Sequence, residues 1–114
     1  MNKAIATIQH IRGETITFGL RAVSPDPAYD GTEAVTCAVK LAVNGNTVPA
    51  ASAPVAQSIT PSFSSGAWLF TITPAQSAAM AAGAYITDAK VIYASGLVDY
   101  PLPLGITLLE RVTA

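Results

Sequence analysis

Apolar and polar side chains alternate along much of this chain with the period of two that is typical of β-strands. The clearest run lies at 68–73, where Trp68, Phe70 and Ile72 share one face of the expected strand. Similar alternating runs predict the remaining strands. They lie at 3–11, 15–23, 33–43, 85–93 and 98–109, with a short strand at 57–62.

One face of each run is expected to enter the core, because burying apolar surface is the main favourable term in folding. We expect Trp68 and Tyr85 to be buried and to face each other beside the helix described next. The other side chains expected to face inward are Ile16, Phe18, Leu20, Ala22, Val35, Cys37, Val39, Leu41, Val43, Thr87, Ala89, Val91, Tyr93, Tyr100, Leu102, Leu104, Ile106 and Leu108.

A short helix is predicted at 74–82, between two of these strands. Thr73 is a good N-cap residue, Pro74 suits the first helical position, and Gln76 completes a capping box with Thr73. Gly83 is the expected C′ residue in a left-handed conformation, where glycine carries no steric penalty.

Turn signals separate the strands and limit the possible folds. The segment 24–32 holds two prolines and an Asp-Gly pair, 63–66 reads as a turn, and 47–56 is a Pro/Ala segment without period. Six or seven short strands with one apolar face predict a single domain over 1–114, an antiparallel β-sandwich, with a closed barrel as the alternative. The helix is too short to be the crossover of a parallel sheet.

The final strand carries two prolines, Pro101 and Pro103. Both lack a backbone N–H, and residues two apart aim that group to the same side. The stretch 100–103 is therefore expected to be a sheet edge or a break. Gly105 is the expected bend, after which the strand can pair on both sides.

Composition narrows the function classes. Only 11% of the 114 residues are charged, against about 25% in a typical domain. The net charge of −1 gives no reason to expect nucleic-acid binding, and the apolar stretches are too short for membrane insertion. The start shows no export signal, and the single Cys37 suits a reducing cytoplasm. The low content of charged residues has two explanations, a surface that is covered in an assembly or an exposed surface rich in Thr, Ser and Ala. We favour the first, because a monomer usually keeps more surface charge for solubility.

Candidate chemistry is sparse. His10 is the single histidine and has no supporting motif, so we expect neither catalysis nor a metal site there. A loop cluster of acidic residues, formed by Asp26, Asp30 and Glu33, is a candidate calcium site. Turn formation is the better explanation, because aspartate is common in loops rich in proline and glycine. Cys37 reads as a small buried apolar residue. We expect no enzyme activity, no cofactor and no metal.

The aromatic residues allow two interpretations. Trp68, Tyr85, Tyr93 and Tyr100 can form a sugar-binding stripe, but their positions on inward faces favour core packing. Tyr29 lies in the Pro/Gly loop and is expected to be exposed.

Three segments carry a resemblance to a known family. They are Gly13-Glu14-Thr15, the stretch T-I-T-P-A-Q-S-A-A-M-A-A-G-A-Y at 71–85, and the closing G-I-T-L-L-E-R-V-T at 105–113. Together they resemble the immunoglobulin-like β-sandwich domain of tailed-phage structural proteins, such as the N-terminal domain of siphophage baseplate upper proteins. The resemblance covers about residues 12–113. It implies a virion building block, made in the host cytoplasm and free of catalytic residues.

The resemblance thus implies a non-enzymatic structural component of a virion, in the tail, baseplate, neck or head, that contacts other virion proteins, and we expect it to form a homo-oligomer. Baseplate proteins of this kind continue into further domains whereas this sequence stops, so we expect a free-standing small protein. An extracellular adhesion or carbohydrate-binding module and a small enzyme are the alternatives. The candidate interface residues are Tyr29, Val48, Pro49, Pro54, Leu69 and Leu109.

Overall fold

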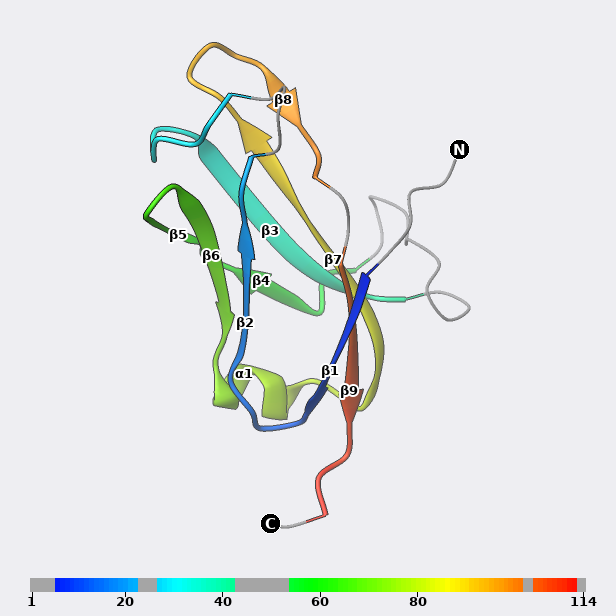
Figure 1. Cartoon of the computed structure of the whole chain (residues 1–114). Helices are drawn as coiled ribbons and strands as arrows, with labels where there is room; N and C mark the ends of the chain where they lie inside the picture. The colour runs from blue at the N-terminus through cyan, green and yellow to red at the C-terminus, as the bar shows by residue number, and fades with distance from the viewer. Residues whose placement is uncertain (1–5, 23–26, 43–53, 102–103, 113–114) are drawn as a thin grey trace.

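The computed structural model of the chain describes residues 6–22, 27–42, 54–101 and 104–112. Within these residues the chain forms nine strands and one helix (Figure 1). In chain order they are β1 (Ala6–Ile11), β2 (Ile16–Leu20), β3 (Ala34–Leu41), β4 (Gln57–Ile59), β5 (Ser62–Ser64), β6 (Ala67–Ile72), α1 (Pro74–Ala79), β7 (Gly83–Ile92), β8 (Val98–Asp99) and β9 (Leu104–Leu109).

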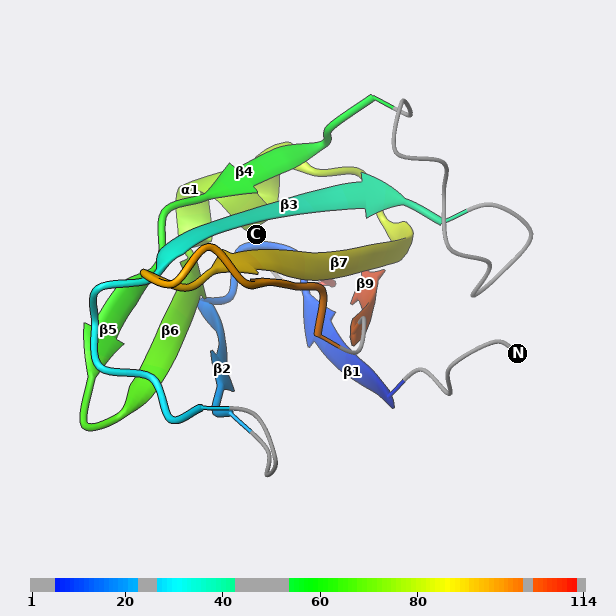
Figure 2. The same cartoon turned by 90° about the horizontal axis from the view of Figure 1, so that it is seen from above.

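The strands form two sheets that pack face to face, which Figure 2 shows from above. The larger sheet has the order β1-β9-β7-β3-β4, with β8 also paired to β7, and the smaller sheet has the order β2-β6-β5. The strands β2, β5 and β6 thus match B, D and E of an immunoglobulin-like sandwich, and β3, β7 and β9 match C, F and G. The predicted all-β, immunoglobulin-like sandwich is confirmed.

One pairing departs from the antiparallel prediction. The first and last strands, β1 and β9, run parallel in a register that extends from Ala6 opposite Leu104 to Ile11 opposite Leu109. A tight turn cannot join parallel neighbours. Here the rest of the domain connects β1 to β9. The pattern of neighbouring residues therefore does not predict that these two strands pair.

The core lies between the sheets and follows the predicted alternation. Inward residues of β2 and β6 stand opposite one another, with Phe18 stacked on Phe70 at 5.2 Å between ring centroids. Tyr85, Thr87, Ala89 and Val91 of β7 are buried as expected, as are residues 106 and 108 of β9.

Leu41 is a correction to the inward set, because 59% of its surface is exposed. The smaller sheet covers only part of the larger one, and β3 extends beyond it (Figure 2). Leu41 lies at the end of β3, where no strand of the smaller sheet covers it. Val43 and Leu102, predicted to face inward as well, lie outside the described residues.

The predicted capping box is confirmed, but the helix is shorter than expected. The Thr73 hydroxyl accepts a hydrogen bond from Gln76 N, and the Gln76 side chain accepts one from Thr73 N. The helix ends at Ala79, because Met80 turns to an extended conformation and buries its side chain in the core. Gly83 therefore opens β7 with a φ of +152° and is not the C′ residue of the helix.

The final strand breaks where its prolines were expected to break it. Tyr100 and Pro101 lie between β8 and β9, while Leu102 and Pro103 lie outside the described residues. The bend predicted at Gly105 is wrong, because Gly105 pairs within β9 with both Thr7 and Ile86. Tyr100, predicted to face inward, is 54% exposed, since the break ends the alternation that was extended across it.

The segment predicted as a turn at 63–66 is half strand. Ser62–Ser64 form β5, which pairs antiparallel with β6. Ser65 and Gly66 then make a two-residue hairpin turn with φ values of 50° and 78°. Two positive φ values in a row are typical of a type I′ turn, which matches the twist of the flanking strands.

Candidate interaction surfaces

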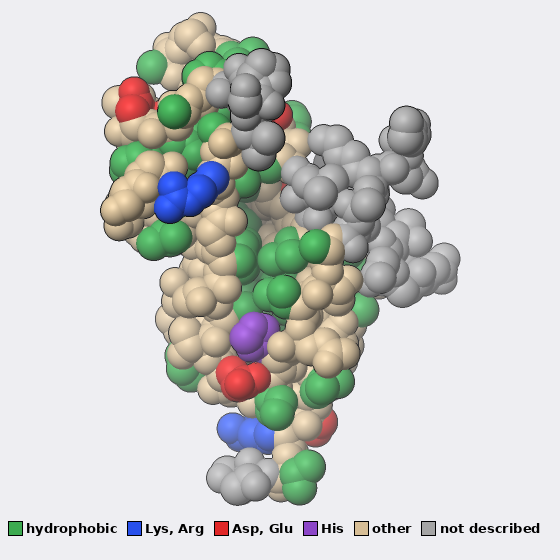
Figure 3. All heavy atoms as spheres, in the orientation of Figure 1, with side chains coloured by type: hydrophobic (Ala, Val, Ile, Leu, Met, Phe, Trp, Pro, Cys, Tyr) green, Lys and Arg blue, Asp and Glu red, His purple; other side chains and the backbone are tan. Residues whose placement is uncertain are grey.

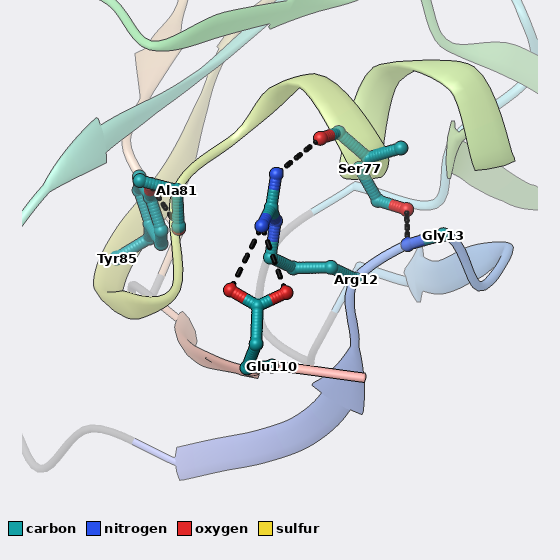
Figure 4. A network of polar contacts seen from close by, with 7 residues as sticks. Arg12, Gly13, Ser77, Ala81, Tyr85 and Glu110 are labelled. Carbon is teal, nitrogen blue, oxygen red and sulfur yellow. Dashed lines mark hydrogen bonds and ion pairs between the residues drawn. The ribbon is translucent and has the colours of Figure 1, made fainter. Parts of the chain in front are cut away.

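A polar network fixes one end of the sandwich, where the β1–β2 turn, the helix and the end of β9 meet (Figure 4). Arg12 donates to both carboxylate oxygens of Glu110 at 2.9 Å, and to the carbonyl oxygen of Ala78 at 2.6 Å. Both contacts to Glu110 come from the same nitrogen, Nη1, while Nη2 makes the contact to Ala78, and hydrogen bonds between charged groups are stronger than those between neutral groups. Arg12 thereby ties the first turn to the last strand and to the helix.

Ser77 extends this network into the interior. Its hydroxyl is fully buried, accepts a hydrogen bond from Gly13 N at 2.9 Å and donates to the carbonyl oxygen of Glu14 at 2.7 Å. Sequence reasoning missed Arg12, Ser77 and Glu110. The one available signal was a serine in the middle of an alanine-rich helix.

Tyr85 closes the same end in the manner of a tyrosine corner, at the start of the strand that matches F. Its hydroxyl donates to the carbonyl oxygen of Ala81 at 2.7 Å (Figure 4). Burial raises the pKa of the Tyr85 phenol, and the nearby Arg12 charge opposes this rise. This hydrogen bond and the Arg12 network stabilise the fold, and neither presents a reactive group to a substrate.

One side of the sandwich leaves two strand edges unpaired. Within the described residues β1 pairs only with β9, and β2 pairs only with β6. On the opposite side, β4 and β5 are three residues long and Pro61 lies between them. Short strands and proline are devices that block edge pairing. The edges of β1 and β2 are longer and contain neither lysine nor proline.

An apolar cleft opens between these two edges. It has a volume of about 260 Å³, and Figure 3 shows hydrophobic side chains gathered in the hollow between the sheets. Five of its large apolar lining residues belong to the two sheets: Ile8, Phe18, Leu20, Phe70 and Leu104. This side of the core is thus partly open to a partner.

The loop before β3 is held by a buried carboxylate. Glu33 accepts hydrogen bonds from the Trp68 indole at 2.9 Å, from Asp30 N at 3.1 Å and from Gly31 N at 3.2 Å. Asp30 accepts two hydrogen bonds from Thr32, and these lower the pKa of the Asp30 carboxyl. Both carboxylates are engaged with the loop itself, as the turn-forming interpretation predicted. Asp26 lies outside the described residues.

Tyr29 was predicted to be exposed, and this is wrong. Only 6% of its surface is exposed, because the loop folds its ring inward to stack on Tyr93 at 5.8 Å. Tyr29 is therefore removed from the candidate interface. The remaining five candidates divide into exposed residues, which are Pro54, Leu69 and Leu109, and residues outside the described ranges, which are Val48 and Pro49.

The aromatic stripe is not formed as a surface. Trp68, Tyr85 and Tyr93 are buried, as the core interpretation predicted, and only Tyr100 is exposed. Trp68 and Tyr85 do not face each other beside the helix. Trp68 is the second residue of β6, next to the hairpin, and packs on Phe63, whereas Tyr85 lies at the helix end of the domain.

The sequence candidates for chemistry stay apart. His10 is half-buried and lies 3.5 Å from the Glu14 carboxylate. Cys37 is buried with its sulfur 3.2 Å from the Thr87 hydroxyl, and burial raises the pKa of its thiol. In the part of the chain that the structure describes, no three His, Cys, Asp or Glu side chains cluster as a metal site would require. No helix in that part is long and apolar enough to span a bilayer.

Comparison with known proteins gives little information beyond the fold. No family model matches the chain, and no curated protein matches it. Among solved structures, the chain is similar to the M1 domain from titin, with a TM-score of 0.38 and 12% identity. That match covers 96% of this chain and 94% of the titin domain. At this level of similarity the match carries no argument about function.

Proposed function

We propose that this protein is a non-enzymatic structural component of a tailed-phage virion, in the tail, baseplate, neck or head, and that it acts through protein–protein contacts. The resemblance of residues 12–113 to tailed-phage sandwich domains supports the virion setting. The low content of charged residues supports a surface that other proteins cover in the assembly. Self-association into a homo-oligomer is part of this proposal.

The observation that carries the proposal is the open side of the sandwich, where β1 and β2 flank the apolar cleft. An exposed strand edge offers a row of backbone donors and acceptors to a partner strand. A cleft beside that edge can take the alternate side chains of the added strand, since side chains of a strand point to opposite faces. Edge and cleft together suit an extended segment with apolar residues at every second position.

Exposed leucines offer further contact on other faces. Leu109 of β9 is 45% exposed and pairs in register with Ile11, which is 43% exposed, so the two form a small apolar patch. Leu69 lies on the outer face of the smaller sheet beside Gly19, with 41% of its surface exposed. Surfaces on different faces suit a head-to-tail arrangement, which closes into a ring when the rotation permits.

Light scattering of the purified chain at increasing concentration tests the proposal. We expect self-association, or binding to the structural proteins encoded beside the gene, and we expect Gln9→Lys to weaken it by placing a charge on the β1 edge. Thr36→Lys is the matched control, because Thr36 is also exposed but lies on β3, which has β7 and β4 as neighbours and is away from Leu69 and from the open edges. A strictly monomeric chain that binds none of these proteins would refute the proposal.

A further inference from the structure

The backbone groups on the open edge of β1 can be assigned from its pairing with β9. The two strands run parallel, and just beyond the end of β1 the N–H of Arg12 donates to the Leu109 carbonyl oxygen at 3.0 Å. The N–H and C=O groups of successive residues in a strand point to alternate sides, so the even-numbered residues of β1 direct theirs to β9. Thr7, Gln9 and Ile11 therefore direct theirs to the open side of the sandwich.

Glu14 closes one end of this edge. The N–H of Ile11 donates to the Glu14 carboxylate, and the Ile11 carbonyl oxygen accepts a hydrogen bond from Glu14 N at 3.0 Å. Both outward groups of Ile11 are thus used within the turn that joins β1 to β2. Within β1, Thr7 and Gln9 keep outward N–H and C=O groups that have no backbone partner among the described residues.

These two residues define the register in which a second β1 strand can pair. Suppose that two identical strands pair antiparallel around a two-fold axis at Ile8. Thr7 of each copy then lies opposite Gln9 of the other, and each such pair exchanges both of its N–H···O hydrogen bonds. An axis at Gln9 would instead place Thr7 opposite Ile11, whose outward groups are already bonded to Glu14. The axis at Ile8 therefore uses all the outward groups that remain available in β1.

The side chains of β1 suit the same arrangement. Ile8 is half-buried on the inner face and lines the apolar cleft. On the two-fold axis it forms a non-hydrogen-bonded pair with itself, at a Cα separation of about 4.5 Å, so the two isoleucine side chains contact each other. Ala6 lies opposite His10 of the second copy. No like charges meet in these pairs, and β1 contains neither lysine nor proline to oppose the pairing.

We propose that the partner of the open side is a second copy of the chain, and that the two β1 strands pair antiparallel around a two-fold axis at Ile8. This inference rests on the self-association in the proposed function and specifies its surface and register. The larger sheets of the two copies then form one continuous sheet. Because both copies use the same surface, the contact closes at two copies, and a larger assembly needs a second surface such as that around Leu69.

Cysteine cross-linking of the full chain tests the register. Under mild oxidation with oxidised glutathione, Ile8→Cys should form a disulfide between two copies, because a Cα separation of about 4.5 Å lies within the range of about 4.4–6.8 Å that disulfides require. Thr7→Cys and Gln9→Cys should each stay monomeric alone, since identical positions are then offset by two residues, but their mixture should form the mixed disulfide. The wild-type chain is the control for the buried Cys37.

Gln9→Pro tests the backbone contribution. Proline removes the outward N–H of position 9 but leaves the hydrogen bonds between β1 and β9 in place, and edge strands tolerate it. In light scattering, dimerisation should weaken at least about tenfold, because each copy loses one donor to the other. Gln9→Thr is the matched control, since it changes the same side chain but keeps the N–H, and it should weaken dimerisation much less.

The failure of this pairing can be told apart from the failure of the proposed function. The pairing is overturned if neither Ile8→Cys nor the mixture of Thr7→Cys and Gln9→Cys gives a cross-linked dimer. It is also overturned if Thr7→Cys alone cross-links as readily as Ile8→Cys, or if Gln9→Thr weakens dimerisation as much as Gln9→Pro. Self-association or binding to virion proteins without these cross-links would leave the proposed function standing, whereas a chain that does neither would overturn both.

Discussion

Replacing Glu33 by alanine should destabilise the fold by about 2–4 kcal/mol. The buried Trp68 indole loses its acceptor, which costs about 1–3 kcal/mol for a buried unsatisfied donor. The amides of Asp30 and Gly31 lose the same acceptor, but both residues are exposed enough to reach water, so each adds only about 0.5 kcal/mol. The loss is large against the total stability of about 5–15 kcal/mol of a small domain.

Urea denaturation followed by tryptophan fluorescence measures this loss directly, because Trp68 is the single tryptophan of the chain and contacts the altered side chain. Glu33→Gln should cost less than alanine, because the amide oxygen can still accept from the indole. Asp30→Ala is the control, since Asp30 is exposed and its carboxylate accepts hydrogen bonds from the neighbouring Thr32.

Two outcomes would contradict this reasoning. A loss below about 0.5 kcal/mol for Glu33→Ala would mean that the indole and the loop amides find other partners at little cost. A rise in melting temperature on adding calcium to the wild-type chain would mean that the loop carboxylates are available to a cation, contrary to their hydrogen bonds with the loop and Trp68.

Four further predictions concern other parts of the fold. Tyr85→Phe should lower the free energy of unfolding, measured by urea denaturation, by about 1 kcal/mol, because the hydrogen bond to Ala81 is lost. Tyr85→Ala should lower it by about 3–5 kcal/mol. A loss below about 1 kcal/mol for the alanine variant would show that Tyr85 is not a core residue. Thr73→Ala should cost about 1 kcal/mol through loss of the helix cap, and an unchanged unfolding midpoint would count against the cap. The Cys37 thiol should react with a thiol reagent at the rate of unfolding, and fast reaction in the native state would contradict its burial. Because the folded pKa of Cys37 is raised, its contribution to stability is present below its unfolded pKa of 9.0 and is lost as the pH rises through the folded value, which pH-dependent melting checks.

Local pattern predicted the features that depend on neighbouring residues. The alternation of apolar side chains gave the strand positions, and the Thr73–Gln76 capping box marked the start of the helix. Both signals arise within a few residues of the chain. The end of the helix was missed because it depends on Met80 reaching the core, which is a tertiary contact.

The contacts that sequence could not reveal join distant segments. Arg12 and Glu110 are separated by 98 positions, and neither belongs to a motif. Tyr29 was placed on the surface because its loop is rich in proline and glycine, but such a composition excludes regular structure without excluding burial of one ring. Tyr100 was placed in the core by extending a period of two across Pro101, where the strand stops.

For the candidate surfaces as well, the sequence predicted the local features but not those that depend on distant strands. Leu69 and Leu109 were expected to be exposed from their phase in the alternation, and they are. The open edges of β1 and β2 depend on the order of strands in the sheets. The pattern of a single strand does not determine that order.

The parallel pairing of β1 with β9 also sets an order of events during biosynthesis. The strand β1 leaves the ribosome before its partner, which consists of residues 104–109, so it stays unpaired until the residues between them have also emerged. The Arg12–Glu110 ion pair must wait for the same moment. Contacts between such distant positions raise the contact order and slow folding. Throughout translation the apolar face of β1 therefore remains available to chaperones, or to the last strand of another copy of the chain.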